Sequence, residues 1–247
     1  MAMREGFSED HNRAVLAFGE GRLDDALAMW NAMPELDPTS PFYDPGMNRS
    51  IAGVHLRKCE FGRARDLIEV IISATEDEHN KRYSSDFATL GVCFWMGRDY
   101  EHALASWKRG LRSNYADSAN VQIPLLIWFG NSWLRSDTSE IIGLLRRRVG
   151  DRRTGIGWPL PIAQYLLGRK SLEQLRAEAE MSSHAHIQIR QRRQAEFYVA
   201  VQQYMQGETE LFAATMSEIA GTKELLSESE RYLAQSLVRD TPTGTTG

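Results

Sequence analysis

The stretch that decides the fold is residues 87–107, FATLGVCFWMGRDYEHALASW, where large and small apolar residues recur at helical spacing. Leu90 shares one face of a first helix with the phenylalanine four residues later, and Gly91 leaves room for a second helix to approach that face. Ala103 occupies the predicted close crossing in the second helix. Trp107, one turn further on, fills the space toward a neighbouring unit. The stretch therefore predicts a helical hairpin.

The same pattern occurs three times in register along the first half of the chain. Counting from Ala26 and from Ala64 gives the same order of small and apolar positions as counting from Ala103. These alanines are 38 and 39 residues apart, so each unit has the length of two helices and their loops. The repetition predicts antiparallel helix pairs over residues 7–37, 45–74 and 83–113, with no β-sheet.

This pattern resembles the tetratricopeptide repeat position for position, with a longer period than the family's usual value of about 34 residues. The extra residues are expected in the loops 38–45 and 75–81, where turn formers and charged residues collect. The resemblance implies an all-α, tetratricopeptide-like helical repeat array (an α-solenoid) followed by additional C-terminal helices.

From about residue 118 the period is lost, although helical patterning continues. Residues 158–161 (WPLP), 165–168 (YLLG) and 196–198 (EFY) resemble the C-terminal half of bacterial tetratricopeptide lipoproteins of the NlpI type. That resemblance implies an adaptor that docks other proteins, such as peptidoglycan hydrolases and proteases. The expected organisation is three helix pairs over 1–117, degenerate helical repeats packed on them over 118–239, and a disordered tail over 240–247.

Composition favours a protein with a true core in a reducing compartment. Of the 247 residues, 42% are hydrophobic, and the two cysteines, Cys59 and Cys93, both fall within helical patterns. The longest apolar run, 123–129, is too short to cross a bilayer. The first ten residues lack the apolar segment of a secretory signal and a cysteine that could accept lipid. A bacterial, cytoplasmic protein is expected.

No arrangement of residues predicts catalysis. The chain has no Gly-x-Ser-x-Gly elbow for a nucleophile and no phosphate-binding glycine loop. His55 with Cys59, and His184 with His186, have the spacing of metal ligands, but two ligands are too few for a tetrahedral site. We therefore expect a non-enzymatic protein without cofactor or metal, in which His55 replaces the usual aromatic residue of its repeat.

Tetratricopeptide arrays bind extended peptides or a partner's helix along the first helices of their repeats. Trp95 is the expected centre of this groove, because large aromatic side chains dominate binding energy in desolvated interfaces. The alternative is that the groove is filled by helices of the same chain. The predicted groove residues are Phe18, Arg49, Leu56, Arg57, Val92, Trp95 and Met96.

Two arginine clusters stand out in a chain of net charge −4. They are most simply a solvated surface; an acidic protein partner is the next interpretation, and nucleic acid comes last because no aromatic residues alternate with them. The favoured function is an adaptor or scaffold for a partner polypeptide, with toxin neutralisation by an immunity-type protein and nucleic-acid binding as alternatives. The predicted basic patch comprises Arg146, Arg147, Arg148, Arg152, Arg153, Arg190, Arg192 and Arg193.

Overall fold

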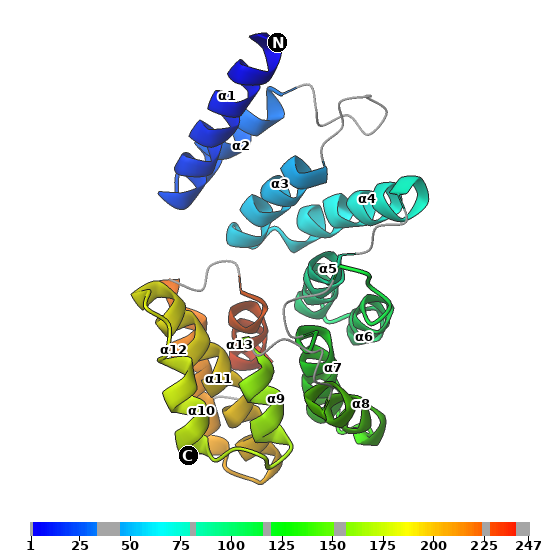
Figure 1. Ribbon diagram of the computed structural model, residues 1–247, viewed down its shortest axis with the longest axis vertical. Coiled ribbons are helices and arrows are strands. Elements are labelled where there is room, and N and C mark those ends of the chain that lie inside the picture. The colour runs from blue at the N-terminus through cyan, green and yellow to red at the C-terminus, as the bar shows by residue number, and fades with distance from the viewer. Residues whose placement is uncertain are drawn as a thin grey trace, which may run out of the picture. The chain divides into compact units, whose positions relative to one another are not determined.

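The computed structural model describes residues 2–33, 45–79, 83–115, 120–150, 157–223 and 228–240 (Figure 1). In these ranges the regular elements are helices, apart from one isolated bridge between Tyr83 and Tyr115. The predicted all-α class is confirmed. The chain forms two compact units, unit 1 over residues 1–82 and unit 2 over residues 83–247, and each is described by itself. The third predicted helix pair thus belongs to unit 2.

Unit 1 contains two consecutive helical hairpins, and each helix packs on the next along the chain. Its core combines small and large apolar residues of the first hairpin with apolar residues of the second. Ala14, Ala17 and Ala26 are fully buried, and Trp30 packs with them against Met47 of the second hairpin. The four helices are α1 (Ala2–Gly19), α2 (Leu23–Asn31), α3 (Pro45–Arg57) and α4 (Phe61–His79).

Unit 2 begins with the third hairpin and ends with helices that pack back on it. Helix α13 packs on α5, and α11 packs on α7, so the end of the chain covers its middle. The first five helices are α5 (Ser84–Met96), α6 (Tyr100–Gly110), α7 (Gln122–Trp133), α8 (Ser139–Gly150) and α9 (Leu160–Leu166). The last four are α10 (Leu172–Ala179), α11 (Ala185–Met205), α12 (Thr209–Gly221) and α13 (Ser229–Asp240).

The three sequence repeats share one type of turn between their helices. Gly21, Cys59 and Arg98 all have positive φ, at 81°, 59° and 63°, and each lies five residues before the repeat's alanine. In each turn, the N–H of the residue that follows the positive-φ residue donates to the carbonyl of the residue five positions before it in the chain, as in a Schellman motif. The common turn gives physical support to the common register that the alanines predict.

The close helix crossing of the third repeat lies where the sequence predicts it. A Cβ on Gly91 would come within 2.1 Å of the Trp107 ring, so only glycine fits there. Ala103 is fully buried, and Trp107 Nε1 donates to the carbonyl of Ala88 at 3.2 Å. In the second half, α10 begins with a capping box in which the Ser171 hydroxyl accepts from the Gln174 N–H and the Gln174 side chain accepts from the Ser171 N–H.

Candidate functional site

The structure brings together two of the four groove residues predicted in unit 1. The guanidinium of Arg57, at the end of α3, lies 4.0 Å from the centre of the Phe18 ring at the end of α1. Arg57 also donates a hydrogen bond to the backbone carbonyl of Phe18. A Cβ on Gly53 would lie 3.6 Å from that ring, an ordinary van der Waals contact, so Gly53 of α3 faces the Phe18 ring. The result is a cation resting on an aromatic ring.

Val15 extends this surface along α1. It lies three residues before Phe18 on the same side of the helix and is 43% exposed. We call Val15, Phe18, Gly53 and Arg57 the α1–α3 face. The other two predicted residues contribute less surface, since Arg49 is half-buried and Leu56 is buried.

The groove residues predicted in unit 2 are not exposed, and the assignment of Trp95 as an accessible anchor is wrong. Trp95 has no exposed surface, and its ring packs between Tyr100, Trp107 and Phe129, at 4.6, 5.6 and 4.8 Å between ring centres. Phe129 belongs to α7, beyond the last recognisable repeat. Helices of the same chain therefore cover this part of the predicted groove, and Val92 and Met96 are buried with it.

The predicted basic patch is not one uniform cationic surface. On α11, Arg190 pairs with Glu228 at 2.7 Å, and Arg193 pairs with Glu196 at 2.7 Å and also with Glu218. These ion pairs neutralise two of the three arginines that α11 contributes to the predicted patch. Arg192 and Arg148 are half-buried, whereas Arg146 and Arg147 of α8 are exposed, and Arg152 and Arg153 lie outside the described residues.

A polar pocket of about 390 Å³ opens on another side of α3 in unit 1. Its α3 residues, Asn48, Ile51 and His55, are spaced by three and four and share one side of the helix. Gly53 and Arg57 lie on a different side, so the pocket and the α1–α3 face are separate surfaces. The pocket is lined by Asn31, Asn48, Ile51, His55, Arg63, Asp66 and Leu67.

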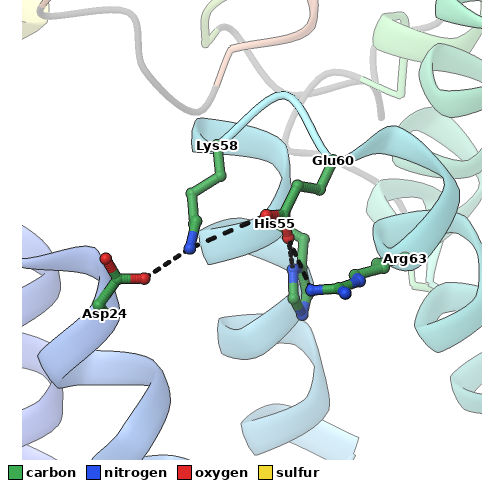
Figure 2. A network of polar contacts seen from close by, with 5 residues as sticks. All are labelled: Asp24, His55, Lys58, Glu60 and Arg63. Carbon is green, nitrogen blue, oxygen red and sulfur yellow. Dashed lines mark hydrogen bonds and ion pairs between the residues drawn. The ribbon is translucent and has the colours of Figure 1, made fainter.

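Glu60 holds the polar groups beside this pocket together (Figure 2). Its carboxylate lies 2.7 Å from His55 Nδ1, 3.4 Å from Arg63 Nη1 and 3.8 Å from Lys58 Nζ. The hydrogen bond from His55 and the neighbouring cations lower the pKa of Glu60, so it stays ionised. Lys58 also reaches Asp24 at 2.5 Å and ties α2 to the turn before α4. Of these residues, the sequence pattern singled out only His55. Its partner Glu60 could have been expected as the acidic residue in the turn that follows α3.

Unit 2 holds a buried series of hydrogen-bonded side chains that the sequence pattern did not predict. Glu230 of α13 is buried, and its Oε1 accepts from Gln194 Nε2 at 2.7 Å and from the Tyr198 hydroxyl at 3.1 Å. Gln194 accepts in turn from Trp158 Nε1 at 2.5 Å. Burial raises the pKa of Glu230 and raises that of nearby Glu228 to about 7. Both carboxyls therefore favour the protonated form more than an exposed glutamate does.

Neither the α1–α3 face nor the polar pocket of unit 1 shows an arrangement typical of catalysis. The lining of the polar pocket contains no serine, threonine or cysteine that His55 could activate as a nucleophile. Among the described residues, no three histidine, cysteine or acidic side chains are grouped so as to hold a metal ion. None of the described helices combines the length and apolar character needed to cross a membrane. No protein-family model matches the chain, and no curated protein is significantly similar to it.

Proposed function

We propose that the protein is a non-enzymatic polypeptide-binding module of tetratricopeptide-like repeats, and that the α1–α3 face holds the partner. The observation that carries the proposal is the contact between Arg57 and the Phe18 ring beside the exposed Val15. First helices of such repeats form the binding surface in peptide-binding arrays. In unit 2 the corresponding positions are buried, so the proposal is confined to unit 1.

The chemistry of the α1–α3 face suggests which segment it would hold. Val15 and the edge of the Phe18 ring offer apolar area for an aliphatic or aromatic side chain. The Arg57 guanidinium is already oriented by the ring and by a backbone carbonyl, which limits the entropy that it loses on binding. A guanidinium in this position favours a carboxylate. The proposed occupant is a partner segment with an apolar side chain next to an aspartate or glutamate.

Selection from a random peptide library on the immobilised full chain tests this function. We expect enrichment of peptides with acidic and apolar residues side by side. Val15→Asp should weaken the selected peptides by about tenfold or more, because it places a negative charge beside their own. Val70→Asp is the matched control, since Val70 of α4 is 41% exposed and belongs to neither surface. Enrichment that survives Val15→Asp, or no enrichment at all, would contradict the proposal.

The same surface could serve a scaffold or an immunity-type protein, because both roles require only that a partner be held. A soluble acidic toxin domain that binds while short peptides fail would favour the immunity role. Nucleic-acid binding has less support than the sequence suggested, since two of the arginines on α11 are neutralised by glutamates.

A further inference from the structure

We propose that helix α13 is a pH-controlled cover of α5: it stays on α5 while the carboxyls of Glu228 and Glu230 are protonated and leaves when they ionise. In peptide-binding repeats the first helices form the binding surface, and α5 is the first helix of the third predicted pair. Release of α13 would therefore uncover a helix of that kind. The inference concerns unit 2 alone and does not depend on partner binding at the α1–α3 face.

Helix α13 covers one side of α5. Helix α6 packs on α5 at Gly91, and α7 packs on it at Trp95. Among the described helices, α13 is the third that packs on α5 to a comparable extent. Val92 and Met96 are four residues apart on one side of α5, and both are buried. We assign their cover to α13.

Several polar atoms of α13 are buried without a hydrogen-bond partner. Among the described residues, nine buried side-chain polar atoms lack a partner, and four of them belong to the 12 residues of α13. A buried group of this kind gains hydrogen bonds with water when its helix leaves. Release therefore costs α13 less than it would cost a helix with all its partners. The four atoms are Glu230 Oε2, Arg231 Nε, Arg231 Nη1 and Ser236 Oγ.

Two carboxyls lie at the start of α13. Glu230 is 1% exposed; its Oε1 accepts from Gln194 and Tyr198 of α11, whereas its Oε2 has no partner. Glu228 precedes the helix, lies 2.7 Å from Arg190 of α11 and is also largely buried. A buried carboxylate costs more free energy than a buried carboxylic acid, because burial penalises the charged form. Ionisation of the two groups therefore favours a state in which both reach water.

The charged and titratable groups that act on these carboxyls come from α11. Arg190 offsets the burial of Glu228 only in part, since the pKa of Glu228 is still raised to about 7. The Tyr198 hydroxyl donates to Glu230, yet burial raises the pKa of that carboxyl as well. Within the described residues of α5 and α12, no side chain forms an ion pair with either glutamate. Arg231 lies over the ring of the residue after it, at 5.5 Å, instead.

The other end of α13 is held at the surface. Asp240 pairs with Arg98 at 2.5 Å and accepts from the Tyr100 hydroxyl at 3.2 Å. Arg98 is 67% exposed, and an ion pair of this kind contributes little, so it does not prevent release. Buried apolar side chains, among them Leu233 and Leu237, keep the helix in place while the carboxyls are neutral.

Hydrogen–deuterium exchange of the full chain between pH 5 and pH 8, corrected for the intrinsic pH dependence of amide exchange, tests the proposal. Protection of the α13 amides should fall by about tenfold or more as the pH rises, because the released form binds fewer protons. At pH 8 these amides should be at least about tenfold less protected than those of α6, which open only when the unit unfolds. Equal protection of α13 and α6, or constant protection of α13 at all pH values, would overturn the proposal.

Two variants test which groups control the release. Glu228→Gln and Glu230→Gln keep an acceptor oxygen and remove the titration, so each should make the pH-dependent loss of α13 protection at least about threefold smaller. Glu218→Gln is the control, because Glu218 also pairs with an arginine of α11 but is 60% exposed. If both variants follow the pH profile of the parent chain, these carboxyls do not control α13 and the proposal fails.

Met96→Cys tests whether release uncovers α5. The introduced thiol is modified with N-ethylmaleimide between pH 6 and pH 8, and peptide mapping compares its rate with that of the exposed Cys59 in the same chain. The ratio of the two rates should rise by about tenfold or more with pH, since both thiols share the general effect of pH on thiolate formation. A constant ratio would show that this side of α5 stays covered and would refute the assignment.

Discussion

Replacing Glu228 by glutamine is expected to remove a pH-dependent loss of stability from unit 2. The side chain is 17% exposed, and its Oε1 lies 2.7 Å from Arg190 Nε of α11. Burial raises its pKa from 4.5 to about 7 despite the arginine, and the carboxyl of Glu230 adds to the shift. Glutamine keeps the shape of the side chain and removes its titration.

The direction in which stability changes with pH follows from the number of protons that the folded and unfolded chains bind. Since the pKa of Glu228 is higher in the folded chain than in the unfolded chain, the folded state binds more protons between these values. The contribution to stability is complete below about pH 4.5 and is lost as the pH rises through about 7. Between about pH 5 and pH 8, this one group should lower the free energy of unfolding by about 2 kcal/mol.

Urea denaturation followed by tryptophan fluorescence measures this effect. Trp30 is the sole tryptophan of unit 1 and the other five belong to unit 2, so the signal reports mainly on unit 2. Between about pH 5 and pH 8, the free energy of unfolding of Glu228→Gln should fall by about 2 kcal/mol less than that of the parent chain. Glu218→Gln is the control, because Glu218 also pairs with an arginine of α11 but is 60% exposed. An identical pH dependence in Glu228→Gln and the parent would refute the reasoning.

Three further substitutions test the packing of the third repeat by thermal or urea denaturation. Ala103→Glu should destabilise unit 2 by about 2–4 kcal/mol because it buries a charge, whereas Ala105→Glu, on the exposed side of the same helix, should have little effect. Gly91→Ala should cost about 1–3 kcal/mol, since its Cβ would collide with an indole ring, while Gly62→Ala in unit 1 meets no atom within 4 Å and should be neutral or stabilising. Trp95→Ala should lower stability by about 3–5 kcal/mol, as expected for a core residue; a fully stable variant would show that the ring is not buried.

The sequence by itself determined the helical class and the close helix crossing in the third predicted helix pair. Gly91 and Ala103 could be recognised because a close helix crossing tolerates only small residues, and this requirement acts between neighbouring helices of one hairpin. The capping box of Ser171 is likewise local, since its two hydrogen bonds join residues three apart. Such features depend on side chains that are close in the chain, so spacing alone reveals them.

Only the tertiary structure decided which of the predicted surfaces are exposed. Trp95 and Phe18 occupy the same position in their predicted repeats. Phe129 of α7 packs on the Trp95 ring, whereas the Arg57 guanidinium lies over the Phe18 ring. The pairing of Arg190 with Glu228 joins residues 38 apart. Periodicity shows which residues share one side of a helix, but whether that side meets solvent, another helix or an opposite charge depends on contacts between distant parts of the chain. The polar pocket also needed the tertiary fold, because Asn31 of α2 lines it together with residues of α3 and α4.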